Sequence, residues 1–299
     1  MGMRAPYGEP RDCAPTLSDQ DIIDFCRNGY LLLEGVVPDD VNRNVVRFLD
    51  EFDDTYEPTP IMEQEWFVDD VLMNPQAAGA VRSLLGRDFS LPVIISNHRG
   101  VLPVERQDWH RDGGSIYTPK LEYLQVFYYP QDCPPEFGPT EVVPGSHFLH
   151  IKNSLMRNYG HIPRAVSTTA PAGSIFLTVY SIWHRRTKAT AEATPENTFR
   201  NLLKYNYWRT APPERDWKVD PGFDASTVDF NISAPCEQFQ GAIAAGEMFS
   251  WLCGFEDQYE KRGGQCWPIV STVRDGVEQM GLPAGLRKDR STKNGPAST

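Results

Sequence analysis

The sequence lacks the marks of an exported, membrane-bound or disulfide-rich protein. It has six cysteines, at positions 13, 26, 133, 236, 253 and 266, and none forms a Cys-x-x-Cys pair. A zinc ribbon, a thioredoxin-type site and a dense disulfide framework are therefore not expected. The longest apolar stretches, such as 174–180, are far shorter than the ~18–20 residues that cross a bilayer, and residues 1–6 contain no apolar signal segment. We expect reduced thiols, a cytoplasmic location and no membrane partner.

Positive charge is also scarce. The chain carries 29 Lys and Arg against 40 Asp and Glu, which gives a net charge of −11. A negative overall field repels polyanions, so no nucleic-acid partner is expected. The hydrophobic content of 40% is ordinary for a packed globular protein, whereas 25 prolines and 23 glycines favour a loop-rich β-protein over a helix bundle. We expect a monomer or homodimer that acts on a small molecule.

The first 60 residues are expected to form a helical preface. Ser18 and Asp21 have the spacing of a capping box, and Gly29 follows as a helix stop. The apolar run 30–33 is typical of a short strand. Pro38 then precedes apolar residues that recur at helical spacing as far as residue 52, which predicts a second helix.

From about residue 90 the pattern changes to short strands separated by Gly- and Pro-rich turns. The predicted strands are Leu91–Ser96, Leu121–Tyr129, Ser174–Val179 and Asn201–Trp208. Several short strands of this kind favour a mainly β sandwich or jelly roll with flanking helices. We expect a single domain over residues 1–285, with its β-core at 90–210 and a mixed cover at 211–285. Within that cover, 238–253 and 273–280 are candidate helices, and the tail 286–299 is expected to be disordered.

Three residues in the predicted β-core have side chains that bind metals. In an extended segment His110 and Asp112 share one face, because residues i and i+2 point to the same side. His184 directly follows an apolar strand and is the natural third ligand. Two histidines and one carboxylate form the facial triad of non-haem Fe(II) oxygenases. On residue chemistry alone, His147 remains an alternative ligand.

Four ordered motifs resemble the phytanoyl-CoA dioxygenase-like family. The segment 16–37 is similar to its N-terminal region, and His110-Arg-Asp112 matches its first metal motif. The segment 138–147, which ends in Pro-Gly-Ser-His, resembles its signature, and 171–184 resembles the strand that delivers its distal histidine. The resemblance implies a double-stranded β-helix (a cupin-like jelly roll) that binds Fe(II) through His110, Asp112 and His184. It also implies a structural role for His147.

The resemblance further implies that 2-oxoglutarate and O₂ are co-substrates and that ascorbate stimulates turnover. It points to Arg200 as the partner of the distal carboxylate of 2-oxoglutarate, since a guanidinium binds a carboxylate through two parallel hydrogen bonds. Arg185 and Arg186 compete for this role, but they lie directly beside a presumed ligand. Thr140 matches a position that can hydrogen-bond the co-substrate, although an ordinary turn threonine is an equal interpretation.

These expectations predict a dioxygenase that hydroxylates an unactivated C–H bond of a small metabolite or natural-product intermediate and releases succinate and CO₂. The presence of Asp112 favours oxygenation over halogenation, because a Gly or Ala there would open a halide position. Desaturation, cyclisation and oxidative demethylation use the same cofactors and remain open, as does a non-catalytic metal-binding jelly roll. The candidate pocket residues, for each of which packing in the core is an equal interpretation, are Trp109, Tyr117, Tyr123, Gln125 and Tyr128.

Overall fold

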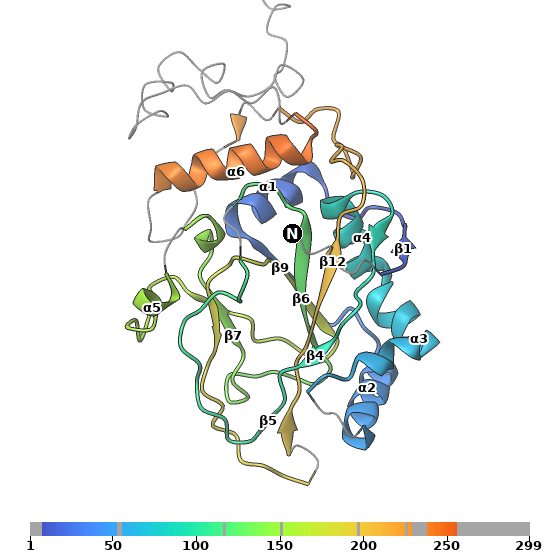
Figure 1. Ribbon diagram of the computed structural model, residues 1–299, viewed down its shortest axis with the longest axis vertical. Coiled ribbons are helices and arrows are strands. Elements are labelled where there is room, and N and C mark those ends of the chain that lie inside the picture. The colour runs from blue at the N-terminus through green and yellow to red at the C-terminus, as the bar shows by residue number, and fades with distance from the viewer. Residues whose placement is uncertain are drawn as a thin grey trace, which may run out of the picture.

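Two antiparallel sheets form the centre of the molecule (Figure 1). The computed structural model describes residues 8–52, 56–115, 118–149, 152–195, 198–224, 227–228 and 238–255. The large sheet has the order β1-β3-β12-β6-β9-β2, with β4 also paired to β12. Its strands are β1 (Pro10–Arg11), β2 (Tyr30–Leu33), β3 (Phe89–Ser90), β4 (Ser96–Asn97), β6 (Tyr123–Tyr129), β9 (Ser174–Val179) and β12 (Leu203–Trp208).

The second sheet is smaller and has the order β10-β7-β8. Its strands are β7 (Thr140–Val142), β8 (Val166–Ser167) and β10 (His184–Arg186). A separate pair joins β5 (Gly100–Val101) to β11 (Phe199–Arg200). The predicted mainly β jelly roll with flanking helices is confirmed. Its long strands gave the clearest sequence signal: β9 has the predicted bounds, and β6 and β12 lie within the predicted strands.

The large sheet has two different faces, because successive side chains of a strand alternate. On β6, Leu124, Val126 and Tyr128 point to one face, where they pack in the main hydrophobic core with the helices. On the other face Phe127 and Tyr129 pack in a second cluster that includes Val142 of the small sheet. This second face lines the interior of the jelly roll, next to the functional side chains described below: His184 packs against Phe127, and Asp112 is hydrogen-bonded to Gln125 and Lys204.

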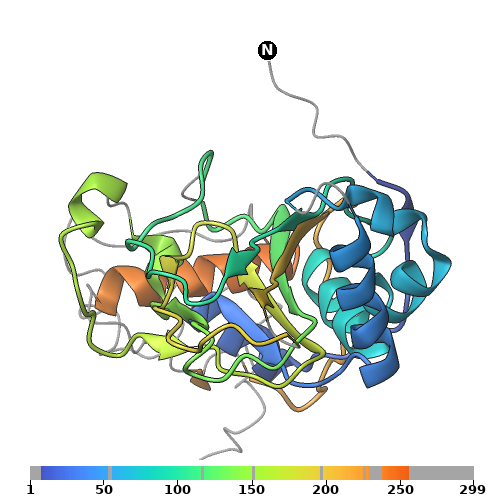
Figure 2. The same ribbon diagram turned by 90° about the horizontal axis from the view of Figure 1, so that it is seen from below.

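Helices flank the two sheets, with α5 on the side of the small sheet (Figure 1). They are α1 (Asp19–Asn28), α2 (Asp39–Glu51), α3 (Glu65–Phe67), α4 (Pro75–Leu85), α5 (Asn153–Met156) and α6 (Gln238–Leu252), with single turns at Thr59–Glu63, Val68–Leu72 and Ser146–Phe148. Figures 1 and 2 show α2, α3 and α4 gathered on one side, while α6 crosses the end of the molecule next to α1. The predicted capping box is present, with Ser18 and Asp21 each bonded to the other's backbone, and Gly29 ends α1 with a φ of 81°.

The structure differs from the sequence prediction at one strand. Residues 91–95 are irregular, and short strands lie on either side of them. Pro92 has no N–H group to donate to a sheet ladder, which explains the interruption. The candidate helix at 238–253 is confirmed as α6, whereas 273–280 and the tail 286–299 lie outside the described residues. The single domain with the bounds 1–285 stays a prediction.

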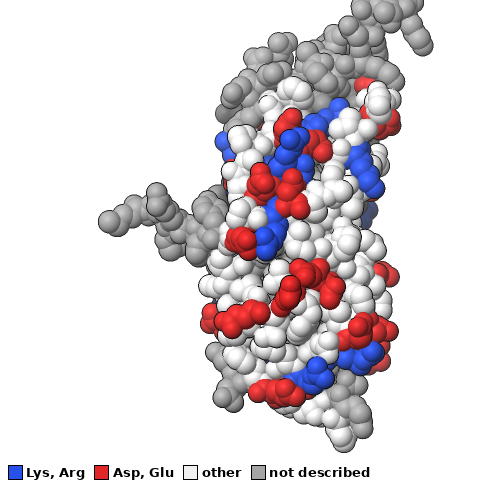
Figure 3. All heavy atoms as spheres, turned by 90° about the vertical axis from the view of Figure 1, so that its right-hand side faces the viewer, with Lys and Arg blue, Asp and Glu red and all other residues white. Residues whose placement is uncertain are grey.

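The surface beside α3 and α4 carries both signs of charge. Figure 3 shows acidic and basic side chains interspersed on this face. Among the helices that the structure describes, none combines the length and apolar character needed to cross a membrane.

Candidate metal centre

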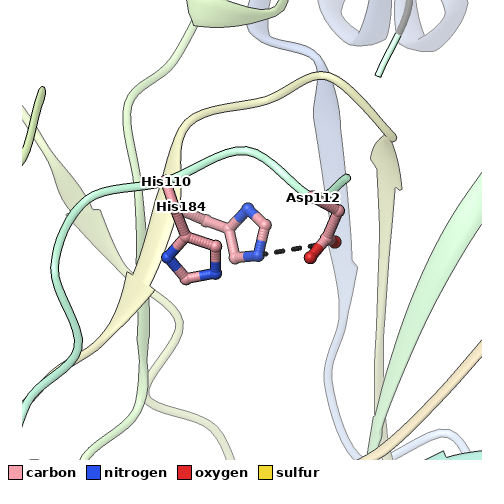
Figure 4. Close-up of side chains that lie close together, drawn as sticks. All are labelled: His110, Asp112 and His184. Atoms are coloured by element: carbon pink, nitrogen blue, oxygen red, sulfur yellow. Dashed lines mark ion pairs between the residues drawn. The ribbon is translucent and has the colours of Figure 1, made fainter. Parts of the chain in front are cut away.

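The two histidines face each other across a pair of backbone hydrogen bonds. The N–H of His110 donates to the carbonyl of His184 at 3.0 Å, and the N–H of His184 donates to the carbonyl of His110 at the same distance. This isolated antiparallel bridge joins the loop before Asp112 to the start of β10, and the two imidazole centroids lie 4.5 Å apart. Figure 4 shows both rings and the Asp112 carboxylate converging from these two segments.

The three side chains have the spacing of a metal site. One ligand atom from each of His110, Asp112 and His184 lies within 4.8 Å of the other two. His110 Nδ1 lies 2.8 Å from the carbonyl of Asp108, and His184 Nδ1 lies 3.0 Å from the carbonyl of Ile182. A carbonyl only accepts hydrogen bonds, so each Nδ1 carries the proton and each Nε2 keeps the lone pair that a metal requires.

The protonation states suit metal binding at neutral pH. Burial is the main cause that lowers the pKa of His184 to about 4, so its imidazole is neutral. Burial alone would raise the pKa of Asp112. The neighbouring His184 and Lys204, together with hydrogen bonds from Lys204 and Gln125, outweigh it and lower that pKa to about 2. The site therefore offers two imidazoles, each with its Nδ1 turned to a backbone carbonyl, and one carboxylate, the donor set that suits an octahedral Fe(II) ion.

Lys204 and Gln125 hold the Asp112 carboxylate in place. The sequence interpretation assigned neither residue to the metal site. The Lys204 ammonium and the Gln125 amide each lie 2.5 Å from Asp112 Oδ2. Both side chains come from the inner face of the large sheet, at adjoining positions of the β6–β12 ladder. The alternation of residues 203–208 places Lys204 on that face, but only the tertiary fold brings it to the carboxylate.

The Pro-Gly-Ser-His segment forms hydrogen bonds with the residues that precede His184. The hydroxyl of fully buried Ser146 accepts a hydrogen bond from the N–H of Trp183, the residue before His184. The carbonyl of His147 accepts one from the Ser181 hydroxyl. His147 Nε2 lies 3.1 Å from the carbonyl of Cys26, and its ring packs so closely on Gly29 that a Cβ there would lie 2.3 Å from Nδ1. The structure thus places His147 against the end of α1 and away from the triad.

A small cavity opens beside the two histidines. It is lined by His98, Gln107, His110, Phe127, Thr140, His184, Arg186, Arg200 and Leu202. Arg200 is 3% exposed, and its Nε and Nη2 atoms are buried without a hydrogen-bond partner among the described residues. An unpartnered buried guanidinium is costly, so these two nitrogens indicate a site for an anion.

The other two candidate arginines differ from Arg200. Arg185 points to the opposite side, where it forms an ion pair with Glu141 at 2.8 Å and lies over the Trp109 ring. Arg186 lines the cavity, although it follows His184 by only two residues, and it donates to the backbone carbonyl of Glu105. Thr140 lies opposite Arg186 in the β7–β10 ladder and also lines the cavity.

The candidate pocket aromatics separate into core and interior residues. Trp109 and Tyr128 are fully buried in hydrophobic clusters, so their role is packing. Tyr123 is half-buried on the inner face, where its ring stacks on Trp208 and contacts Tyr180. Tyr117 lies outside the described residues.

Comparison with known proteins supports this assignment of the fold. Residues 46–188 match the family model described as phytanoyl-CoA dioxygenase. No curated protein sequence matches the chain. HygX from Streptomyces hygroscopicus with iron bound is 16% identical, with a TM-score of 0.50 over 65% of this chain and 88% of that chain. HygX with nickel and 2-oxoglutarate bound is 17% identical, with a TM-score of 0.50 over 75% and 97%. The likeness to HygX shows a shared fold.

Proposed function

The chain is a member of the phytanoyl-CoA dioxygenase-like family, and from that premise we propose that it is a non-haem Fe(II)- and 2-oxoglutarate-dependent dioxygenase. Its reaction is the hydroxylation of an unactivated C–H bond of a small metabolite or natural-product intermediate, with release of succinate and CO₂. O₂ is the oxidant, and we expect ascorbate to stimulate turnover and the protein to act in the cytoplasm as a monomer or homodimer.

The observation that carries the proposal is the pairing of a metal triad with an unpartnered arginine in one cavity. His110 and His184 present Nε2 lone pairs, and Asp112 completes the set within 4.8 Å. Arg200 lines the same cavity and offers two nitrogens without a partner among the described residues. The HygX structures, which share this fold, hold iron in one case and nickel with 2-oxoglutarate in the other. The residues present fit both groups.

The protein side chains have three tasks in this reaction. The triad holds the metal, with each histidine oriented by a backbone carbonyl and Asp112 oriented by Lys204 and Gln125. Arg200 binds the distal carboxylate of 2-oxoglutarate, and Thr140 lies at the cavity wall as a further hydrogen-bond donor. When bound, iron and 2-oxoglutarate together supply the activation of O₂. The surrounding buried side chains keep bulk water out of the interior.

A non-catalytic metal-binding jelly roll is the main competing function. A protein of that kind would leave the two Arg200 nitrogens without hydrogen-bond partners, whereas a dicarboxylate co-substrate accepts hydrogen bonds from both. Desaturation, cyclisation and oxidative demethylation need the same iron and co-substrate, so they differ from hydroxylation only in the product.

The test combines metal binding, co-substrate binding and product analysis. Purified protein is titrated with Fe(II) without oxygen and then with 2-oxoglutarate, and the visible absorption of the chelate is recorded. We expect one Fe(II) per chain and a chelate band that His184→Ala abolishes. Candidate substrates are then screened for stimulated succinate release, with mass detection of +16, −2 or −14 products. Iron binding without any 2-oxoglutarate binding would contradict the proposal.

A further inference from the structure

The interior of the jelly roll has a strongly positive charge balance. Three cationic side chains, Arg186, Arg200 and Lys204, lie around the triad and its cavity, and among the described residues Asp112 is the one carboxylate hydrogen-bonded to any of them. A divalent metal and the dianion 2-oxoglutarate cancel each other, so loading the site leaves the balance at two positive charges. A small organic anion would reduce that excess.

The imidazole of His98 reports the same positive field. Its pKa is lowered to about 4, first by burial and then by Lys204; Asp112 acts in the opposite direction, and Arg200 and Arg186 add smaller lowering effects. His98 therefore stays neutral and adds no further cation to the cavity.

Lys204 has donors to spare. Its ammonium has three N–H groups, and among the described residues Asp112 is its only hydrogen-bond partner. The side chain is 13% exposed, and its Nζ lies 5.7 Å from the centroid of the Phe127 ring and 6.0 Å from that of Tyr180. Two N–H groups of the ammonium thus remain without a partner among the described residues.

Three aromatic side chains, those of Tyr123, Tyr180 and Trp208, form a surface near Lys204. Tyr123 stacks on Trp208 with centroids 4.5 Å apart, and the Tyr180 ring lies 5.1 Å from that of Tyr123. All three residues are partly exposed; Tyr123 and Trp208 lie on the inner face of the large sheet, and Tyr180 directly follows β9. The Tyr180 hydroxyl donates to the carbonyl of Gly113, so this surface is tied to the loop that carries Asp112.

The register of the sheet separates the Arg200 cavity from the aromatic surface. Leu202 directly precedes β12 and lines the Arg200 cavity, and the inward residues that follow along β12 are Lys204, Asn206 and Trp208. Lys204 therefore lies between the co-substrate end and the aromatic end, next to the metal ligand. A ring packed on the aromatic end would place an attached anionic group within reach of the free Lys204 donors.

We propose that Tyr123, Tyr180, Trp208 and Lys204 form the substrate subsite and that it selects a small ring-bearing organic anion. The ring packs on the three aromatic side chains, and a carboxylate or phosphate group binds the Lys204 ammonium. Lys204 is thereby the specificity-determining residue for charge. This inference rests on the proposed function, because it names the substrate class of the same site.

The experiment measures charge preference with matched probes. Protein loaded with Fe(II) and saturating 2-oxoglutarate, without oxygen, is titrated by calorimetry with phenylacetate, phenyl phosphate and the neutral phenylacetamide. We expect at least one anion to bind about tenfold or more tightly than the amide, as a charge-assisted hydrogen bond provides. Comparison of the two anions distinguishes a carboxylate from a phosphate substrate.

Four variants separate charge from ring contacts. Lys204→Met, or the smaller change Lys204→Gln, should reduce the anion-to-amide ratio to about one, and Lys204→Arg should keep it. Trp208→Leu should weaken anion and amide alike. Lys188→Met is the matched control, because Lys188 is an exposed lysine paired with Glu105 outside the cavity. Equal binding of anion and amide by the unmodified protein, no binding by any probe, or an unchanged ratio in Lys204→Met would overturn the proposal.

A further arm distinguishes this inference from the proposed function. Failure to bind Fe(II) or 2-oxoglutarate contradicts the function. The subsite is then tested alone by the same titration on metal-free Arg200→Met protein, in which the competing anion site is removed. An anion preference that disappears on adding Lys204→Met to that protein supports the subsite whatever the reaction.

Discussion

Replacement of Arg200 by methionine should separate co-substrate binding from both folding and metal binding. The side chain is 3% exposed, and two of its three nitrogens have no partner among the described residues. Its remaining nitrogen lies 3.5 Å from the carbonyl of His98. Methionine fills much of the same volume without the charge, so the main loss is the two hydrogen bonds that 2-oxoglutarate would accept.

The expected magnitude follows from those two hydrogen bonds. Taken together as one charge-assisted, two-pronged pair, these bonds contribute about 1.5–3 kcal/mol, and every ~1.4 kcal/mol is tenfold in affinity. The Kd for 2-oxoglutarate should therefore rise about tenfold to a hundredfold, while the Kd for Fe(II) stays unchanged. Because the unliganded guanidinium is buried at a cost, the variant without ligand should unfold at the same temperature as the unmodified protein or a higher one.

The assay is thermal unfolding with and without co-substrate. At 2-oxoglutarate equal to 100 times its Kd, the unmodified metal-loaded protein gains about 2.7 kcal/mol. A variant that binds a hundredfold more weakly gains only about 0.4 kcal/mol at the same concentration. Arg200→Lys keeps the charge without the two-pronged geometry and should fall between.

Arg186 provides the decisive comparison, since it is the other arginine of the cavity. Arg186→Met should raise the Kd for 2-oxoglutarate less than Arg200→Met does, because the Arg186 guanidinium already donates to the carbonyl of Glu105. The reasoning is refuted if Arg200→Met keeps the full thermal shift and Arg186→Met loses it.

Three further outcomes are expected. His184→Ala should abolish Fe(II) binding measured by titration, whereas His147→Gln should retain it; the reverse pattern would overturn the ligand assignment. Incubation with excess bromide should give an oxygenated and not a brominated product by mass spectrometry, because Asp112 occupies the ligand position that a halide would need. Burial lowers the pKa of His147 to about 3, so between pH 6.5 and 3 only the unfolded chain gains a proton there, and stability falls by up to ~1.4 kcal/mol per pH unit. His147→Gln should reduce this acid loss in urea titrations, and the exposed-site control His161→Gln should leave it unchanged.

The regular parts of the fold were predictable because they depend on local chemistry. The α1 capping box and its Gly29 stop are written within a dozen residues, and β9 is an apolar run with a glycine before it. The helix α4 was not predicted, although Asn74 caps it and Pro75 occupies its first turn. The candidate strand 91–96 was wrong, because buried apolar residues alone do not exclude an irregular segment around Pro92.

The sequence motifs predicted the three candidate metal ligands but not the residues that hold Asp112. The i, i+2 spacing placed His110 and Asp112 together, and the structure joins His184 to them by a backbone bridge that no local pattern encodes. Gln125 was considered for the substrate pocket, but it instead donates to Asp112. No local pattern assigns Lys204 to the site, because its contact with Asp112 spans 92 residues of chain.

Net charge and local charge lead to opposite expectations about the ligand. The total of −11 argues against polyanionic partners at long range. Screening limits the reach of exposed charges to about 8–10 Å in ordinary salt, whereas buried charges are screened much less. Arg186 and Arg200 line the cavity and Lys204 lies beside the triad, while the neighbouring carboxylate of Asp112 already accepts hydrogen bonds from Lys204 and Gln125. A small anion inside the jelly roll therefore experiences a positive field, even though a large polyanion at the surface does not.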